Sequence, residues 1–283
     1  MNVLSIQSHV AYGHVGNRSA VFPLERLGIS VWPVNTVQFS SNSGKPGWKG
    51  RVYPAGDIVD VMGGIESLGV LGDCAAVLSG YVGDAATGSA ILAAVDAVKR
   101  ANPSAVYCCD PVMGDIPEGF YVRPDIPGFM RCQAVPRADI VIPNHFEAEA
   151  LSGLSVGSAP EAARAAEAIR GTGPRIVVIT SYTEPGDDRV GFYLSCDEGN
   201  WRLLTPRLPF AKSIKGSGDL FSALFLGRWL ASGDARPALE LAAASLYGIL
   251  RATAAAGLDE LAIVQAQEAI AGPVVEFRAE PAD

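Results

Sequence analysis

The feature that most constrains the fold is an alternation of short runs rich in β-branched residues with longer alanine-rich segments. The runs predict buried strands that begin at Asn2 (NVLSIQ), Ile29 (ISVWPVNTVQF), Cys74 (CAAVLSG), Ala105 (AVYCCDPV), Asp139 (DIVIPN) and Arg175 (RIVVIT). The clearest helical patterns, residues 88–103 and 158–174, each have an early Ser as a candidate cap and Gly or Asn-Pro at the end. Because strands and helices alternate, the sequence predicts an α/β fold with a mostly parallel sheet and helices on both faces.

Two segments depart from this alternation and predict additions to the sheet. Residues 39–53, FSSNSGKPGWKGRVY, are rich in Ser, Gly and Pro and precede a short strand, which predicts a flap or a small edge sheet. Residues 189–208, RVGFYLSCDEGNWRLLTPRL, predict a hairpin that turns around residues 197–200 and adds an antiparallel edge.

The length of 283 residues suits one large domain or two small ones, at roughly 100–200 residues per domain. No long linker, repeat or low-complexity stretch interrupts the sequence, so we expect a single domain over residues 1–283. Hydrophobic residues make up 49% of the chain and charged residues 18%, which excludes a disordered or coiled-coil protein.

Charge and cysteine content restrict the partners and the compartment. A net charge of -8 with only 22 Lys and Arg argues against a nucleic-acid partner, because phosphate binding needs clustered basic residues. The opening MNVLSIQSHV has neither a basic region nor a long apolar run, so we expect no signal peptide, no membrane anchor and a cytoplasmic location. Five cysteines without CxxC spacing predict reduced, buried thiols rather than disulfides or a zinc site.

Polar residues follow several of the predicted strands. They occur in IQSHVAYGHVGN after the first strand, CDPVMGD after the strand at Val106, PNHFEAE after the strand at Ile140 and TSYTEPGDD after RIVVI. Ligands of open parallel sheets bind outside the carboxyl ends of the strands. These stretches therefore predict a functional site along one edge of the sheet.

In the stretch SIKGSGDLFSALFLG, two glycines and one carboxylate precede an apolar run at helical spacing. If Gly216, Ser217 and Gly218 form the turn into that helix, their N–H groups converge and the helix dipole adds positive potential, which makes an anion hole. Asp219 then lies in the first turn, beside the bound anion. A carboxylate is unfavourable there unless it takes a proton from the nucleophile that attacks the anion, so we interpret Asp219 as a general base.

The alternative is a glycine-rich turn in which Asp219 only stabilises the helix N-terminus. Other phosphate-binding motifs are missing, since the sequence has no GxxxxGK[ST] and no GxGxxG after a strand. Their absence weakens the case for a P-loop NTPase and for a dinucleotide-dependent dehydrogenase.

The chain resembles the pyridoxal kinases of the ribokinase-like superfamily, from residue 4 to about residue 250. The stretches that carry the resemblance are, in order, LSIQSHVAYGHVGNRSAVFPLERLG, VNTVQFS, LSGYVGD, CDPVMGD, IPNHFEAE, VVITS and KGSGDLF. Sugar kinases of the superfamily usually show a Gly-Gly pair near the N-terminus and a DTxGAGD signature. Hydroxymethylpyrimidine kinases usually begin with an AGSDxSGGAG stretch, which is absent here.

The resemblance implies a ribokinase-like fold and transfer of the ATP γ-phosphoryl group to the 5'-hydroxyl of pyridoxal. Asp219 would accept the hydroxyl proton while Gly216, Ser217 and Gly218 hold the transferring phosphoryl group. Two other functions stay open: phosphorylation of hydroxymethylpyrimidine or another small alcohol, and a non-catalytic vitamin B6 carrier.

For the nucleotide, the resemblance implies contacts by Asp110, Ile142, Glu147, Thr180, Ser181, Pro206 and Phe210. With few Lys or Arg near the predicted site, the phosphate charge must be met by metal ions, and Asp110 and Glu147 are expected to hold Mg²⁺ largely through water. Without the resemblance, a role of Asp110 as a turn former before Pro111 would be as good an explanation as a role in metal binding. Other relatives carry Lys in place of Thr180. The resemblance also implies a homodimer, and it leaves assistance by K⁺ open.

For pyridoxal, the resemblance implies contacts by Ser8, Ser43, Gly44, Tyr81 and Asp219. The alternatives are that Ser8 only caps the turn after the first strand and that Tyr81 belongs to the core.

The flap departs from the family pattern. Relatives often read SNHTxY where this chain reads SSNSGKP, so Asn42, Ser43 and Lys45 replace His, Thr and an aromatic residue. This puts ring preference in doubt, and Lys45 could supply charge instead. We expect residues 41–48 to close over pyridoxal and to exclude water during transfer.

Overall fold

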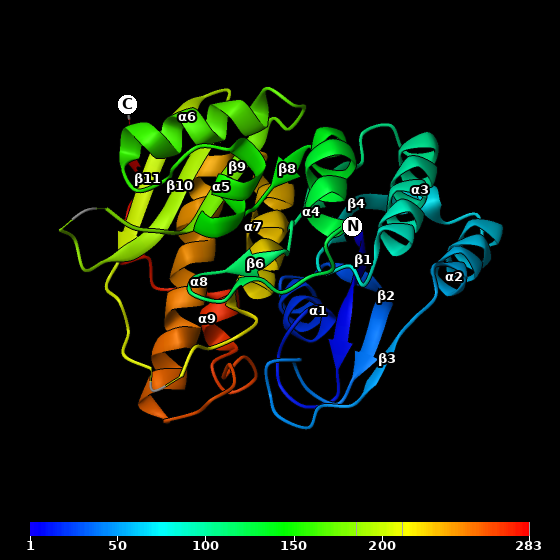
Figure 1. Ribbon diagram of the computed structural model, residues 1–283, viewed down its shortest axis with the longest axis horizontal. Helices are drawn as coiled ribbons and strands as arrows, with labels where there is room; N and C mark the ends of the chain where they lie inside the picture. The colour runs from blue at the N-terminus through cyan, green and yellow to red at the C-terminus, as the bar shows by residue number, and fades with distance from the viewer. Residues whose placement is uncertain (185, 211, 283) are drawn as a thin grey trace.

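The computed structural model describes residues 1–184, 186–210 and 212–282. Within these residues ten strands form one continuous sheet, in the order β12-β11-β10-β9-β8-β5-β4-β1-β2-β3 (Figure 1). The strands are β1 Asn2–Val10, β2 Ser30–Phe39, β3 Gly50–Val52, β4 Cys74–Ser79, β5 Val106–Cys109, β8 Ile140–Val141, β9 Ile176–Tyr182, β10 Val190–Cys196, β11 Gly199–Thr205 and β12 Glu280–Pro281. The six from β2 to β9 at its centre are parallel, which confirms the predicted fold class.

Antiparallel strands extend the sheet at both edges. At one edge β3 pairs with β2, with Val37 opposite Val52, so the flap segment returns as the predicted short edge strand. At the other edge β10 pairs with β9 and β11, and the predicted hairpin turns between Cys196 and Gly199. The parallel strands therefore form the centre of the sheet, and the predicted flap strand and hairpin extend it at its two outer edges.

Helices cover both faces of the sheet (Figure 1). Their bounds are α1 Asn17–Arg26, α2 Ala55–Ser67, α3 Ala85–Ala101, α4 Ile126–Phe129, α5 His145–Ser152, α6 Ala159–Arg170, α7 Ser217–Ser232, α8 Ala235–Ala255 and α9 Glu268–Ala271. Successive residues of β1 point to opposite faces, so Leu4 belongs to the core cluster that includes residues of α2, α3 and α6, while Val3 belongs to the cluster that includes residues of α1, α7 and α8. A strand that is buried on both sides explains the continuous apolar run in the sequence.

Helix α7 is apolar on nearly every side because it is enclosed. Every residue from Leu220 to Gly227 is buried, and the helix packs against both α1 and α8. A helix that is hydrophobic all round is buried in a core rather than amphipathic. This packing holds the first turn of α7 beside the carboxyl ends of the parallel strands.

Some details differ from the sequence predictions. The cap of α3 is Asp84, which accepts a hydrogen bond from the Thr87 N–H, so this helix begins before the predicted serine. A short second hairpin, β6 (Gly114–Asp115) with β7 (Gly119–Phe120), was not predicted because two-residue strands have no readable periodicity. The thiol of Cys132 is exposed, so the prediction of buried cysteines is wrong at this position. None of the helices in the described ranges is long and apolar enough to cross a bilayer.

Candidate active site

Two adjoining cavities lie at the carboxyl ends of the parallel strands. The α7 cavity, of about 260 Å³, is lined by Asp110, Ile142, Glu147, Thr180, Ser181, Phe192, Ser217 and Leu246, among others. The flap cavity, of about 310 Å³, is lined by Ser8, Val10, Val15, Phe39, Asn42, Ser43, Gly44 and Tyr81, among others. Both are also lined by Val112, Tyr121, Lys215, Gly216 and Asp219. The cavities therefore meet at the start of α7.

The sheet topology explains why the cavities form here. Strand β1 pairs with β2 on one side and with β4 on the other, so the order of the chain reverses around β1. The loops leaving the two sides of such a point diverge and leave a crevice. Ser8 lies near the end of β1 and Tyr81 follows β4, and both line the flap cavity.

Gly216 sets the direction in which the chain enters α7. Its φ is +87°, and a Cβ at this position would collide with the backbone carbonyl oxygen of His14. Only glycine is compatible with both conditions. The helix begins at Ser217, so Ser217 and Gly218 belong to its first turn and their N–H groups have no partner earlier in the helix. The N–H groups of the predicted anion hole thus lie at the start of α7, and the binding of an anion there stays a prediction.

Asp219 lies in the same first turn, at the point where the cavities meet. Burial raises the pKa of its carboxyl group to about 6, although a hydrogen bond from the backbone N–H of Gly16 opposes the rise. Such a group is ionised at neutral pH and is more basic than an ordinary aspartate. These are the properties of a general base.

Asp110, which follows β5, is tied to the helix that carries Asp219. The Ser222 hydroxyl donates a 2.8 Å hydrogen bond to Asp110 Oδ2, and Ser222 lies three residues after Asp219 on α7. Burial raises the pKa of Asp110, and the nearby carboxylates of Glu147 and Asp219 raise it further. These carboxylates repel one another, so a positive charge between them would be stabilised, and the binding of Mg²⁺ by Asp110 stays a prediction.

Glu147 holds the loop after β5 against the start of α5. One carboxylate oxygen accepts the N–H groups of Met113 (2.8 Å) and Gly114 (3.4 Å), and the other accepts the N–H of Asn144 (2.9 Å). The Asn144 side chain in turn accepts the Glu147 N–H, which completes a capping box. The structure therefore gives Glu147 a positioning role, and its contact with a metal ion stays a prediction.

The sequence model of the family described as "Phosphomethylpyrimidine kinase" matches residues 70–262. The pyridoxal kinase PdxY of Rubrobacter xylanophilus is 50% identical over 280 residues, which cover 98% of this chain and 96% of that protein. The pyridoxal kinase PdxY of Deinococcus radiodurans is 46% identical over 285 residues, with 99% and 96% coverage.

The chain belongs to the pyridoxal kinase family. Among solved structures, pyridoxal kinase from Leishmania donovani in complex with ADP and pyridoxine matches with a TM-score of 0.92 at 31% identity and covers 99% of this chain and 98% of that one. The resemblance described from the sequence and the ribokinase-like architecture are both confirmed.

The structure brings most of the predicted site residues of this pyridoxal kinase family member together, although their roles stay predictions. Ser8, Ser43, Gly44 and Tyr81 line the flap cavity, and Asp110, Ile142, Glu147, Thr180 and Ser181 line the α7 cavity. Ser181 has a φ of 55°, which makes it the one non-glycine residue with positive φ in the described chain, and such backbone strain clusters at functional sites. Pro206 and Phe210 line neither cavity; the neighbouring Thr205 does.

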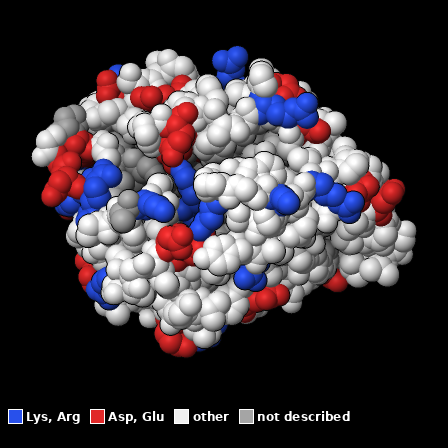
Figure 2. Space-filling view, turned by 60° about the horizontal axis from the view of Figure 1, so that its bottom comes forward, with Lys and Arg blue, Asp and Glu red and all other residues white. Residues whose placement is uncertain are grey.

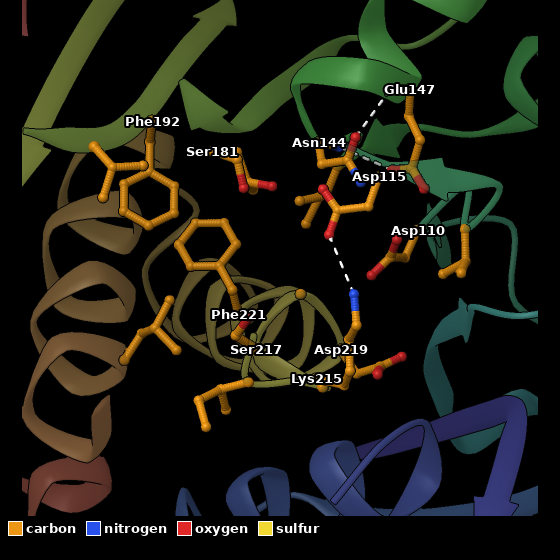
Figure 3. Close-up of a pocket in the computed structure, with 18 of the residues that line it drawn as sticks. Asp110, Asp115, Asn144, Glu147, Ser181, Phe192, Lys215, Ser217, Asp219 and Phe221 are labelled. Atoms are coloured by element: carbon orange, nitrogen blue, oxygen red, sulfur yellow. Dashed lines mark hydrogen bonds and ion pairs between the residues drawn. The ribbon is translucent and has the colours of Figure 1, made fainter. Parts of the chain in front are cut away.

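Aromatic and aliphatic side chains form one end of the α7 cavity. Phe192 and Phe221 stack with their ring centroids 4.3 Å apart, and Leu246 and Leu250 of α8 lie beside them along the cavity. Figure 3 shows these rings on the opposite side of the cavity from Asp110 and Glu147. The cavity is therefore apolar at one end and acidic at the other.

Lys215 was overlooked in the sequence as a site residue. It immediately precedes Gly216 and lines both cavities, and Figure 3 shows its side chain crossing the α7 cavity toward Asp115. On the face of the molecule in Figure 2, positive and negative side chains lie close together around a hollow rather than in a patch of one sign. From the sequence we expected few Lys or Arg near the site and did not name this one.

An ion pair holds the flap in place over the flap cavity. Lys45 Nζ lies 2.7 Å from Glu260 Oε1 and 3.0 Å from Asp259 Oδ2, and it lies 4.9 Å from the centroid of the Tyr12 ring. Glu260 also accepts the His14 N–H at 3.1 Å. Lys45 therefore connects the flap to the segments that carry Tyr12 and residues 259–260, a role for which an aromatic side chain would be unsuited.

Lys45→Met is expected to raise the KM for pyridoxal about three- to tenfold with little change in kcat, because partly exposed ion pairs contribute modestly. Steady-state kinetics measures this effect, and limited proteolysis should show faster cleavage within residues 41–48. Lys49→Met, at an exposed lysine just after the flap, is the matched control. An unchanged KM together with unchanged cleavage would show that the ion pair does not restrain the flap.

Proposed function

We propose that this protein transfers the γ-phosphoryl group of ATP to the 5'-hydroxyl of pyridoxal and so forms pyridoxal 5'-phosphate. The observation that carries the proposal is that the α7 cavity and the flap cavity meet at Asp219 and Gly216. Two substrates that occupy them would face each other across a general base and an anion hole. The Leishmania donovani relative, a pyridoxal kinase in complex with ADP and pyridoxine, supports this assignment.

The proposed reaction is an in-line displacement at the γ-phosphorus atom. The 5'-oxygen of pyridoxal forms a bond to phosphorus, the bond from phosphorus to the β,γ-bridging oxygen breaks, and its electron pair leaves on ADP. The hydroxyl proton moves to the carboxylate of Asp219, and the N–H groups of Ser217 and Gly218 stabilise the transferring phosphoryl group.

The two cavities suit these substrates in shape and polarity. The stacked Phe192 and Phe221 and the leucines of α8 offer an apolar site for adenine, while the flap cavity offers Val10, Phe39 and Tyr81 to a pyridine ring. Ser8 supplies a nearly buried hydroxyl for a polar substituent of that ring. Apolar walls with a few fixed polar groups are typical of small-molecule sites.

The carboxylates of the α7 cavity suit a Mg²⁺ ion that is held partly by the phosphates of the substrate rather than by the protein alone. Among the described residues no group of three or more His, Cys, Asp or Glu side chains is arranged to hold a metal. Mg²⁺ usually keeps several waters and takes one or two carboxylates plus substrate phosphates. We assign Asp110 as the carboxylate that holds it, with Glu147 second, and the ion would neutralise charge on the phosphates.

A homodimer, a cytoplasmic location and a single domain over residues 1–283 belong to the same proposal. Light scattering on the purified protein tests the dimer directly, since a dimer has twice the chain mass of 29.5 kDa.

The deciding experiment incubates the protein with ATP and Mg²⁺ and, in separate reactions, pyridoxal, pyridoxine, pyridoxamine or hydroxymethylpyrimidine, with ADP release and phosphorylated product as readouts. We expect turnover to be fastest with pyridoxal. If only hydroxymethylpyrimidine is phosphorylated, it and not pyridoxal is the acceptor. If pyridoxal binds but no acceptor is phosphorylated, the protein is a carrier.

The raised pKa of Asp219 predicts the pH dependence of the reaction. The base must be ionised, so kcat/KM for ATP should be constant above about pH 7 and should fall about tenfold per pH unit below a pKa near 6. The profile is measured from pH 5 to 9 at saturating pyridoxal. A profile that stays flat down to pH 5, as an ordinary aspartate pKa of about 4 predicts, would contradict the assignment.

A further inference from the structure

The charges that line the two cavities are strongly unbalanced. Carboxylates of Asp110, Asp115, Glu147 and Asp219 face the α7 cavity, and Glu118 faces the flap cavity. Among the described lining residues of both cavities, Lys215 is the only Lys, Arg or His. A polyanionic phosphate donor that enters this site consequently meets one protein cation on a side chain.

Lys215 reaches the region where the cavities meet. Its Nζ lies 3.2 Å from Glu118 Oε1 and 3.8 Å from Asp115 Oδ2, two carboxylates in and beside the β6–β7 hairpin. The dashed line in Figure 3 marks its pairing with Asp115 across the cavity. The backbone of the same residue leads directly into Gly216 and the anion hole.

These ion pairs are of the kind that exchanges readily. The side chains of Lys215, Asp115 and Glu118 are 35%, 38% and 43% exposed, so water screens their attraction. Lysine presents its charge on a flexible four-carbon chain with rotatable donors. A phosphate group carries more negative charge than either carboxylate and can displace them.

We propose that Lys215 is a further catalytic residue: its ammonium group leaves Glu118 and Asp115 when ATP binds and donates to the oxygens of the γ-phosphoryl group during transfer. The inference rests on the proposed function. Bonds and proton move as described for the displacement at phosphorus, and the ammonium group of Lys215 stabilises the charge that develops on the transferring group.

The competing explanation is structural, in which Lys215 only fastens the β6–β7 hairpin to the start of α7. The two explanations differ at Glu118. If the ion pair itself matters, Glu118→Gln should reproduce the damage of Lys215→Met. If the carboxylate merely competes with phosphate, Glu118→Gln should lower the KM for ATP about two- to fivefold, because Lys215 is released.

The test compares Lys215→Met, Lys215→Arg and Lys99→Met. Lys99 is the matched control, since its side chain is 33% exposed and is also paired with an aspartate, Asp139, outside both cavities. We expect Lys215→Met to lower kcat about a hundredfold, which is the scale for loss of one charged donor to a transition state. The KM for pyridoxal should change less than about threefold. Lys215→Arg should recover to within about tenfold of the original kcat, and Lys99→Met should stay within about twofold.

Melting temperatures of the variants show whether each one folds. If the original protein is inactive toward every acceptor, that result refutes the proposed function rather than this inference. With an active original protein, a kcat for Lys215→Met within about threefold of the original overturns the role of Lys215. A loss of kcat in Glu118→Gln equal to that in Lys215→Met overturns it as well, in favour of the structural explanation.

Discussion

Asp219→Asn should lower kcat for pyridoxal phosphorylation by at least about a hundredfold, and the binding of ATP should be retained. The amide keeps the shape of the side chain and can still accept the Gly16 N–H, but it cannot take the proton of the attacking hydroxyl. Steady-state kinetics gives the loss in kcat, and calorimetric titration with ADP gives the binding. The acid limb near pH 6 should also vanish from the residual activity of the variant.

The same substitution should not weaken the fold. Because the pKa of Asp219 is raised above its unfolded value, this group favours the folded state most strongly below about pH 4, and that contribution is lost as the pH rises through about 6. Asp219→Asn removes the ionised group, so its melting temperature at pH 8 should equal or exceed that of the original protein. Turnover within tenfold of the original would refute the assignment of the base, and a melting temperature well below the original would mean that the substitution disturbs the structure.

Gly216→Ala is expected to have the second large effect. The new methyl group would collide with the carbonyl oxygen of His14, and the positive φ alone costs an alanine about 1–2 kcal/mol. The chain must shift at the start of α7, which displaces the N–H groups of the anion hole. We expect kcat to fall about tenfold to a thousandfold, since an error of 1 Å in position can cost about a hundredfold.

Gly233→Ala is the matched control for this prediction. Gly233 ends the same helix, has a φ of 72°, and has nothing within 4 Å of the position of a Cβ. It should lose about 2–4 °C of melting temperature through backbone strain and should keep its activity. A Gly216→Ala variant that also keeps full activity would show that the geometry of this turn does not matter for transfer.

The sequence predicted those parts of the site that depend on local pattern. Buried strands show as apolar runs, and their ends locate Asp110 and Thr180 without any tertiary information. Asp219 was recognised because glycine, carboxylate and helix follow one another along the chain. The spacing from Asn144 to Glu147 is a capping-box pattern, and it could have predicted the cap that the structure shows.

Features that depend on tertiary contacts could not be predicted. Nothing local to KGSGD shows that Lys215 points toward a second hairpin, because that hairpin lies a hundred residues earlier and its strands are two residues long. Glu147 accepts the N–H of Met113, 34 residues before it, a contact that only folding brings about. Pro206 and Phe210 were predicted from the resemblance alone. Neither lines the α7 cavity, whereas Thr205, which precedes Pro206, does.

The meeting of two cavities at one helix end has a consequence for how such enzymes diversify. Half of the residues that line the flap cavity lie before residue 70, where the match to the phosphomethylpyrimidine kinase family model begins, whereas every residue that lines the α7 cavity lies within that match. Under the proposed function, recognition of the acceptor would thus use one stretch of the chain that recognition of the donor does not. The separation is incomplete, because the Gly16 N–H bonds to Asp219 and the His14 carbonyl oxygen lies against Gly216. A designer who changes the acceptor through residues 8–44 must therefore keep the backbone at these two positions, so that the start of α7 stays in place.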